Sequence, residues 1–463
     1  MQRFTLVLLA AFLILTIFLL TSGISGRDPN ELLIWTQDLP PGRAVLDKLL
    51  GKYMLEVNPG LGELIQQNLK DPAAFDRLMD SNPRLIDIKR HLRDAEVLDQ
   101  YLKTHPLQRA EHIYYETEEL RSNFIVAALG GSGPDLVYGP ADMVGPFHEM
   151  RIIQPLEAFF SEQELSRFDP MGLIRFEGHL YMIADRIGNH LALVYNKKLL
   201  PKPPQTTDEL IELGKTLTKD LNHDGLPDQY TLAWNFIEPF FFVPFLGGFG
   251  GWVMDENARP TLNTEATVNA CKFIEELRRK KIIPRECDLD LANQLFKQQK
   301  TAMVINGPWS WGGYLDAGVE IGLARIPLVS ATGRWPTPMI SAKGYCLNAN
   351  VDAQRREKVL HLLRFLTRPE NELEFTRALR EIPSRLEVRS DSLFLHDPLL
   401  KASQDQLSVG RPMPINTEMR AIWDAMRPAY QSVLNGQLTP EQAAKQMQEV
   451  AERKIAEMRG KAS

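Results

Sequence analysis

The chain has 463 residues, which is enough for two substantial hydrophobic cores. Its composition, 44% hydrophobic and 24% charged, is that of a globular protein. The formal net charge of −6, without any basic run, gives no reason to expect nucleic acid as a partner. We find no internal repeat and no low-complexity tract.

The first 26 residues predict export in either of two ways. Positions 4–20 are almost entirely apolar, and no charged residue follows Arg3 until Arg27. About 20 apolar residues can span a bilayer, which favours an uncleaved transmembrane anchor. Small residues in 21–25 offer a cleavage site, which favours a secretory signal peptide. Both interpretations place the rest of the chain outside the cytoplasm.

The chain contains three cysteines, Cys271, Cys287 and Cys346. An odd number leaves at least one thiol without a partner in the same chain. Cys271 and Cys287 could form a disulfide in an oxidising compartment, and the alternative is that both are buried thiols. A lipid-modified N-terminus needs a cysteine just after the apolar start, and since the first cysteine is Cys271, none is expected.

The exported part opens with a predicted strand at 31–35 and a predicted helix at 43–55. The loop between them contains Asp38, which either accepts hydrogen bonds from ligand hydroxyls or only leads into the helix. The next segment, 58–107, is charged and helix-prone, and we interpret it as a helical insertion.

A strand–helix–strand unit follows the insertion. Residues 112–116 and 134–138 predict strands, and 117–129 predicts a helix that ends at Gly130–Gly133. These glycines lie between a helix and a strand in that order. A phosphate-binding loop needs the reverse order, so none is predicted here.

A hairpin and a further strand come next. Residues 176–186 predict two strands with Glu177 and Gly178 at the turn, and 191–200 predicts a strand followed by a helix start. Asn189 lies between these two units. Its amide can both donate and accept hydrogen bonds.

The segment 220–228 has the pattern D-x-N-x-D-G-x-x-D, which is typical of calcium loops. The candidate ligands are Asp220, Asn222, Asp224 and Asp228. Thr231 stands where a complete EF-hand has a bidentate Glu, so the loop is not an EF-hand. The prediction is a structural Ca²⁺ site, and the alternative is a turn rich in Asx hydrogen bonds.

The run 301–312 carries the strongest signal of a binding site. Thr301–Ile305 predicts a short buried strand, which Asn306–Pro308 ends, because Asn and Gly tolerate positive φ and Pro lacks an N–H. Trp309 and Trp311 follow at the carboxyl end of the strand, the edge at which open α/β sheets bind ligands. An indole offers a flat apolar face to a sugar ring, although both rings could instead be core residues.

These motifs together resemble the extracellular solute-binding proteins of ABC sugar importers, the maltose-binding-protein-like family. The resemblance covers about 31–455 apart from the insertion, and its motifs occur in order: the helix with its glycine-rich end before Pro134-Asp135, the strand 191–200, Glu238-Pro-Phe240, and the helix 290–300 before Asn306-Gly-Pro-Trp309. It implies an α/β, two-lobed periplasmic-binding-protein fold, type II-like, with the ligand cleft between lobes joined by crossing hinge strands.

Applied to this chain, the resemblance implies five parts: a signal peptide or anchor (1–26), a first lobe carrying the insertion (27–188), a second lobe (189–340), a return to the first lobe (341–385), and C-terminal helices mainly on the second lobe (386–463).

The resemblance also implies which residues line the cleft. Aromatic rings would stack on the sugar, and carboxylates and one amide would bond its hydroxyls. The predicted set is Trp309, Trp311, Glu238, Phe240, Tyr138, Asp142, Asn189, Asp38 and Trp423. Maltose binders carry a Trp and an Arg where this chain has Gly139 and Met143, which argues against maltose itself as the ligand.

The predicted function is the substrate-binding component of an ABC importer, located in the periplasm or on the extracytoplasmic face. It would capture a carbohydrate, an oligosaccharide or sugar derivative, and deliver it to membrane permease subunits; no enzymatic activity is expected. One alternative is a membrane-anchored glycoside hydrolase with Asp142 and Glu238 as its carboxylate pair. Another is a sugar-sensing ectodomain. Relatives that bind phosphodiesters, polyamines or metal ions leave a ligand other than sugar open.

Overall fold

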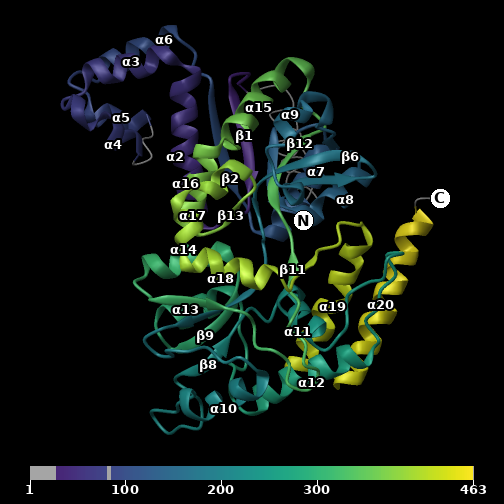
Figure 1. Cartoon of the computed structure of the whole chain (residues 1–463). Helices are drawn as coiled ribbons and strands as arrows, with labels where there is room; N and C mark the ends of the chain where they lie inside the picture. Colours follow the sequence, from purple (N-terminus) through teal and green to yellow (C-terminus); the bar gives the residue numbers. More distant parts are fainter. Residues whose placement is uncertain (1–27, 81–84, 462–463) are drawn as a thin grey trace, which may run out of the picture.

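The computed structural model describes residues 28–80 and 85–461, and Figure 1 shows two lobes, one above the other. The predicted signal peptide or anchor, 1–26, lies outside the described residues. Among the residues that are described, no helix combines the length and the apolar character needed to cross a membrane.

The first lobe is built on a mixed eight-stranded sheet. Its main path runs β13–β6–β12–β3–β1–β2, with β4 beside β12 and β5 beside β6. β1 is parallel to β2 and β3, with Ile34 opposite Leu136 in β3, whereas β12 is antiparallel to β3 and β6. The strands are β1 (Glu31–Thr36), β2 (Arg109–Tyr114), β3 (Leu136–Pro140), β4 (Ile153–Gln154), β5 (Leu173–Phe176), β6 (His179–Ile187), β12 (Lys343–Asn348) and β13 (Ile382–Pro383).

The second lobe is built on a four-stranded sheet in the order β10–β7–β9–β8. β7 is antiparallel to both β9 and β10, with Val194 opposite Val304 in β9, and β8 is parallel to β9. A two-stranded ribbon, β11 with β14, lies near the junction of the lobes (Figure 1). The strands are β7 (Ala192–Asn196), β8 (Tyr230–Ala233), β9 (Thr301–Asn306), β10 (Ile321–Ala324), β11 (Met339–Ile340) and β14 (Arg411–Pro412).

Helices cover both sheets, and each lobe has its own hydrophobic core. The first lobe carries α2 (Pro40–Val57), α7 (Thr117–Leu129), α8 (Val144–Glu149), α9 (Glu162–Leu165), α15 (Ala353–Leu366) and α16 (Pro369–Leu379). The second carries α10 (Thr207–Leu217), α11 (Val243–Gly248), α12 (Glu265–Arg279), α13 (Leu289–Lys297), α14 (Pro308–Asp316), α18 (Pro398–Leu407), α19 (Glu418–Leu434) and α20 (Pro440–Lys461). Short 3₁₀ turns, among them η2 (Ala141–Met143) and η5 (Pro239–Phe241), and α17 (Ser392–His396) complete the chain.

Local sequence explains why the main elements begin and end where they do. All six residues of β9 are buried, as a fully covered strand of short apolar sequence requires. α14 begins at Pro308, whose missing N–H costs nothing in a first helical turn. The predicted hairpin is confirmed, and its turn residues Glu177 and Gly178 have φ of 49° and 87°, as the tightest hairpin turns require.

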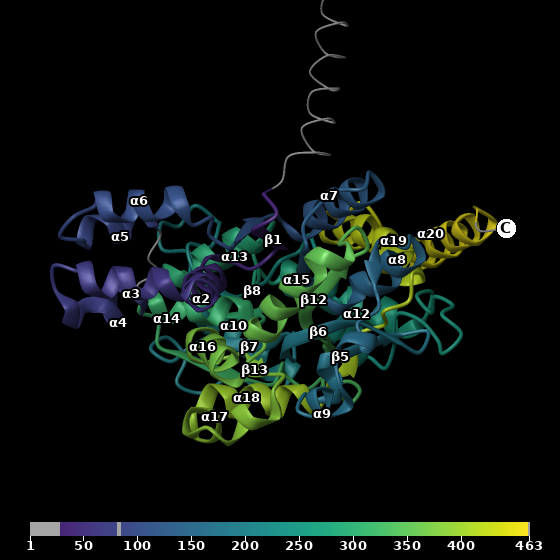
Figure 2. The ribbon, with the colours of Figure 1, turned by 90° about the horizontal axis from the view of Figure 1, so that it is seen from above.

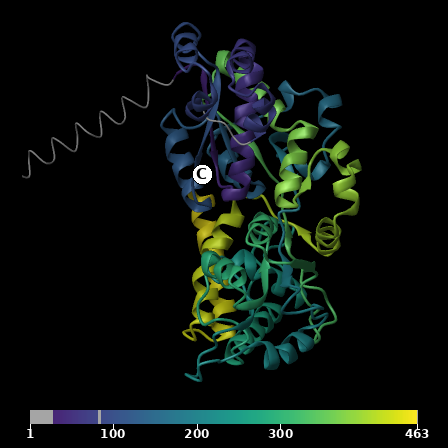
Figure 3. The ribbon, with the colours of Figure 1, turned by 90° about the vertical axis from the view of Figure 1, so that its left-hand side faces the viewer.

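The chain crosses between the lobes near Asn189, between β6 and β7, returns at Ser341, between β11 and β12, and passes to the second lobe once more between β13 and α18. The first two crossings touch, because the Asn189 N–H donates to the Ser341 carbonyl at 2.8 Å. The C-terminal helices α19 and α20 complete the second lobe, since Tyr430 and Met447 belong to its core. Figure 3 shows these helices running beside the second lobe.

The predicted helical character of 58–107 is confirmed, and its status as an insertion relative to the family stays a prediction. The segment consists of α3 (Pro59–Asn68), η1 (Pro72–Ala74), α4 (Phe75–Asp80), α5 (Leu85–His91) and α6 (Glu96–Thr104). Figures 1 and 2 show it standing out from one side of the first lobe, at the end of α2. Its buried apolar residues form a separate small cluster that includes Leu61, Ile65 and Leu98. The insertion is therefore a packed unit of its own.

The three cysteines Cys271, Cys287 and Cys346 are all buried and unpaired. The alternative of a Cys271–Cys287 disulfide is therefore wrong, and the alternative of buried thiols is confirmed. Burial raises the pKa of the Cys271 and Cys287 thiols to about 12, so both carry their proton at neutral pH.

Candidate ligand-binding site

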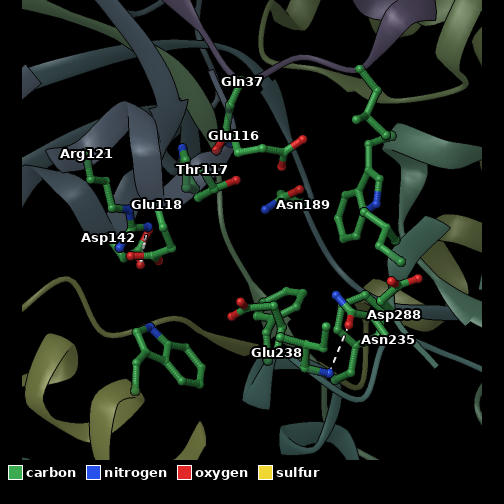
Figure 4. Close-up of a pocket in the computed structure, with 18 of the residues that line it drawn as sticks. Gln37, Glu116, Thr117, Glu118, Arg121, Asp142, Asn189, Asn235, Glu238 and Asp288 are labelled. Atoms are coloured by element: carbon green, nitrogen blue, oxygen red, sulfur yellow. Dashed lines mark hydrogen bonds and ion pairs between the residues drawn. The ribbon is translucent and has the colours of Figure 1, made fainter. Parts of the chain in front are cut away.

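A cavity of about 500 Å³ lies between the two lobes (Figure 4). α7, the end of β3 and the start of β12 contribute to it from the first lobe. The loops before η5 and α13, the start of α14 and one face of α19 contribute from the second. Its polar and aromatic lining includes Gln37, Glu116, Thr117, Glu118, Arg121, Asp142, Asn189, Asn235, Glu238, Phe240, Asp288, Asp290, Trp309, Lys343, Trp423 and Arg427.

Aromatic rings line the second-lobe side of the cavity. Trp309 stands at the start of α14, with its ring centroid 6.3 Å from that of Phe240. Trp423 comes from α19, and its side chain is almost buried. Flat apolar faces of this kind suit the C–H face of a sugar ring.

Gly307 decides where the Trp309 ring lies. A Cβ atom at Gly307 would lie 2.1 Å from the indole ring, which is far closer than any real contact. The ring is therefore folded back over the backbone of Gly307. Gly307 does not use the positive φ that glycine tolerates, because its φ is −104°. It is required for close approach instead.

Two carboxylates on the cavity wall are held in ion pairs with arginines, and Figure 4 shows the pair of Asp142 with Arg121. Arg121 donates to both carboxylate oxygens of Asp142, each at 2.7 Å. Arg427 of α19 donates to Glu238 at 3.0 Å. These pairs fix the direction of each carboxylate while leaving its remaining lone pairs for a ligand.

An ion pair also joins the lobes across the rim of the cavity. Glu118 of α7 in the first lobe bonds Arg420 of α19 in the second, and it lies 3.9 Å from Arg427. Burial alone would raise the pKa of the Glu118 carboxyl, but the charges of Arg121 and Arg420 hold it below its ordinary value.

Two buried amide oxygens on the cavity wall have no hydrogen-bond partner within the described structure. They are Gln37 Oε1, just after β1, and Asn189 Oδ1, at the crossing between the lobes. Buried polar atoms in folded proteins are almost always paired. These two acceptors are therefore available to a donor from a bound molecule, such as a hydroxyl group.

The structure places six of the nine predicted binding residues on the cavity wall. They are Asp142, Asn189, Glu238, Phe240, Trp309 and Trp423. The fold brings these six side chains to one cavity, and their contact with a ligand stays a prediction.

Trp311 does not face the cavity. Two residues along an α-helix turn by about 200°, so Trp309 and Trp311 project from nearly opposite sides of α14. Trp311 is fully buried in the second-lobe core, with its ring edge toward His190 at 6.4 Å. It packs the fold behind the cavity wall.

Tyr138 and Asp38 are also buried away from the cavity. The Tyr138 hydroxyl donates to Asp185 at 3.0 Å and its ring packs 4.7 Å from that of Tyr345. Asp38 is 3% exposed and accepts from Arg186 at 2.7 Å. The predicted direct contact of these two side chains with a ligand does not fit this placement.

Sequence reasoning missed several lining residues, among them Gln37, Arg121, Lys343 and Arg427. One signal could have found Arg427, because it lies four residues after Trp423 and so shares its helix face. Lys343 carried no such signal, since only the folded β12 shows that its side chain reaches the cavity.

The predicted calcium loop is held together by its own side chains. Asp228 accepts from the backbone N–H groups of Leu221 and Asn222 at 2.8 and 3.2 Å, and Asp220 accepts from Gly225 at 2.8 Å. Within the described parts of the chain, no group of three His, Cys, Asp or Glu side chains is arranged to hold a metal ion. Calcium binding stays a prediction.

The fold and the interlobe cavity define a two-lobed binding protein, and comparisons with known proteins agree. Residues 96–402 match the family described as bacterial extracellular solute-binding protein. This chain therefore belongs to the bacterial extracellular solute-binding proteins. The predicted two-lobed periplasmic-binding-protein fold is confirmed.

One similar structure and two relatives illustrate the family. A maltose/maltodextrin-binding domain from Bdellovibrio bacteriovorus, solved with bound maltotriose, is 41% identical with a TM-score of 0.78, over 92% of this chain and 100% of that one. The maltotriose-binding protein of Pyrococcus abyssi is 27% identical over 70% of this chain and 71% of its own length. The galactooligosaccharide-binding protein of Bacillus subtilis is 24% identical over 70% and 78%.

Proposed function

We propose that this protein binds a linear malto-oligosaccharide of about three glucose units in the interlobe cavity and delivers it to the permease of an ABC importer. The observation that carries the proposal is the cavity wall itself. The aromatic rings of Trp309 and Phe240 line the same cavity as the unpaired amide oxygens of Gln37 and Asn189. Such a wall offers both a stacking surface and acceptors for hydroxyl groups.

The charge of the cavity wall supports a neutral polyol over an anion. Six carboxylates line the cavity, Glu116, Glu118, Asp142, Glu238, Asp288 and Asp290, against the three cations Arg121, Lys343 and Arg427. A phosphodiester would face this acidic excess at close range. Hydroxyl groups instead donate hydrogen bonds to carboxylates, each worth about 1.5–3 kcal/mol.

Gly139 and Met143, two positions at which this chain differs from maltose binders, pack against each other. Met143 is buried and packs over Gly139, since a Cβ at Gly139 would lie 2.0 Å from its methyl group. Neither residue lines the cavity. The sequence argument against maltose therefore rests on two positions outside the cavity lining. The maltotriose bound in the similar structure supports a ligand longer than maltose.

Catalysis is not part of the proposal. Both carboxylates of the glycoside hydrolase alternative are paired with arginines, Asp142 with Arg121 and Glu238 with Arg427. A catalytic acid must reach the glycosidic oxygen to transfer its proton, and each of these carboxylates is already bound to a guanidinium. Membership of the solute-binding family also favours binding and transport over catalysis.

The test is calorimetric titration of protein that begins at Arg27 with maltose, maltotriose, maltotetraose and a galacto-oligosaccharide. We expect saturable binding of maltotriose, with the sugar recovered intact. Glycerol phosphodiesters and polyamines serve as ligands of other classes. Recovery of cleaved sugar would support the hydrolase, and tighter binding of the galacto-oligosaccharide would change the sugar class.

Trp309→Ala tests the stacking wall. Removing one aromatic platform should weaken maltotriose binding by about tenfold or more, since stacking and buried area are both lost. Trp335→Ala is the matched control. Its half-buried ring stacks under Arg325 at 5.0 Å elsewhere on the second lobe, away from the cavity lining. Equal effects of the two substitutions would count against the site.

A further inference from the structure

Lys343 connects the two lobes at the wall of the cavity. It is the first residue of β12, just after the second crossing between the lobes, and its side chain is 7% exposed. Its ammonium group donates to Asp38 of the first lobe at 3.3 Å. The same nitrogen lies 5.9 Å from the ring centroid of Trp309 in the second lobe, within the range of a cation–π contact.

The partner of Lys343 is itself fixed in place. Asp38 accepts from Arg186 at 2.7 Å, and Arg186 also donates to Asp185 at 3.1 Å and to Glu381 at 2.8 Å. All of these groups are buried. Burial alone would raise the pKa of the Asp38 carboxyl, but the charges of Arg186 and Lys343 hold it below its ordinary value. Asp38 is thus a charged anchor with one orientation.

The ammonium group has more donors than this anchor uses. An ammonium carries three N–H donors, and among the described residues Asp38 is its one hydrogen-bond acceptor. Lys343 lines the cavity, so its remaining donors have access to a bound molecule. The nitrogen that carries them lies over the Trp309 ring, on which the proposed sugar would stack.

We propose that Lys343 is a ligand-binding residue that donates to a hydroxyl of the sugar unit stacked on Trp309, and that Asp38 is the positioning residue that aims it. The inference rests on the proposed function. It assigns Asp38 an indirect role in place of the direct contact expected from the sequence. A single sugar unit would then contact both lobes, because Lys343 belongs to the first lobe and Trp309 to the second.

The test combines Lys343→Met with maltotriose derivatives that each lack one hydroxyl. A hydrogen bond from a charged donor is worth about 1.5–3 kcal/mol, so we expect Lys343→Met to weaken maltotriose binding by roughly 10- to 100-fold. One deoxy derivative should bind wild-type protein weakly and yet lose little further affinity with Lys343→Met. Such a cycle isolates the pair from a general loss of stability.

Two further variants test whether a loss of affinity reflects the lost hydrogen bond or a failure to fold. Lys343→Arg retains a charged donor and should recover part of the affinity. Asp38→Asn keeps the lysine but removes the carboxylate that orients it. This variant should therefore discriminate less between maltotriose and the same deoxy derivative. Lys215→Met, at an exposed ion pair with Glu212, is the control and should change nothing. Melting temperatures of all variants report whether each is folded.

The outcomes separate the two proposals. If wild-type protein binds no glucan, the proposed function falls and this assignment falls with it. If wild-type protein binds maltotriose but Lys343→Met binds equally well, only the assignment is overturned. It is also overturned if Lys343→Met loses the same factor for every deoxy derivative, because no single hydroxyl would then be its partner.

Discussion

At the scale of single residues, the position of one ring depends on the absence of one methyl group. The Trp309 indole occupies the space that a side chain at Gly307 would need. Trp309 is half-buried and lines the cavity, so its orientation decides which face a ligand meets. A substitution that touches no ligand should therefore change binding.

Gly307→Ala should displace the indole and weaken maltotriose binding by about tenfold or more, with a change in tryptophan fluorescence. The reason is a contact that no Cβ atom can tolerate, and the nearby ring must move to relieve it. Calorimetry measures the affinity. Gly313→Ala in the same helix is the control, because its Cβ would meet Lys297 at an ordinary 3.5 Å. Unchanged affinity in Gly307→Ala would show that the ring position is unimportant.

Single residues also show what the sequence could predict about the site and what it could not. The resemblance to the family correctly predicted three residues that lie shortly after the end of a strand: Trp309, Glu238 and Asn189. All three line the cavity. Trp311 was predicted to line the cavity beside Trp309, but helical geometry places the two rings on nearly opposite sides of α14. The role of Asp38 depends on Arg186, which is distant in sequence, and only the folded chain shows that they meet.

At the scale of elements, the strands, hairpin and insertion followed from local patterns of apolar residues, turn residues and helix formers. The order of strands in each sheet did not, since β12 joins the first-lobe sheet only after most strands of the second lobe have intervened. The resemblance to a known family supplied this long-range information, and local propensities carry none of it.

The insertion should be removable. Its two ends meet, because the Asn58 side chain donates to the Gln108 carbonyl at 2.6 Å and accepts from the Gln108 N–H at 3.1 Å. Its own small core also does not merge with the first-lobe core. Replacing 59–107 by a short glycine linker should leave maltotriose affinity unchanged within about twofold, since short flexible loops close at low cost.

Calorimetry and a melting curve test the deletion. A folded variant with unchanged affinity would assign the insertion a role outside ligand binding. Aggregation, or loss of the cooperative melt, would instead show that the apolar end of α2 near Met54 needs this cover, since Met54 contributes to the small core.

At the scale of the whole molecule, the connection between the lobes contains a buried histidine. His190 follows the first crossing and is fully buried, with Nδ1 donating to the Gly188 carbonyl and Nε2 accepting from the Ser403 hydroxyl at 3.4 Å. Gly188 stands before the crossing, and Ser403 belongs to α18 of the second lobe. Burial lowers the pKa of the His190 imidazole from 6.5 to about 4.

This histidine makes stability depend on pH. In the unfolded chain the imidazole takes up a proton as the pH falls below about 6.5, whereas in the folded chain it stays neutral until about pH 4. Its contribution is therefore constant above pH 6.5 and is lost progressively between pH 6.5 and 4. The loss at pH 4 is on the order of 3 kcal/mol.

His190→Asn tests this dependence, because an amide can keep the bond to the Gly188 carbonyl without titrating in this range. The buried carboxyls Asp185 and Glu372 have raised pKa values and also make stability vary with pH, but they are present in both proteins and cancel in the comparison. Denaturant unfolding at pH 7 and pH 4 should show wild-type protein losing about 3 kcal/mol more than the variant. Equal losses would mean that His190 is protonated in the folded protein, and the crossing between the lobes would then have to accommodate a buried positive charge.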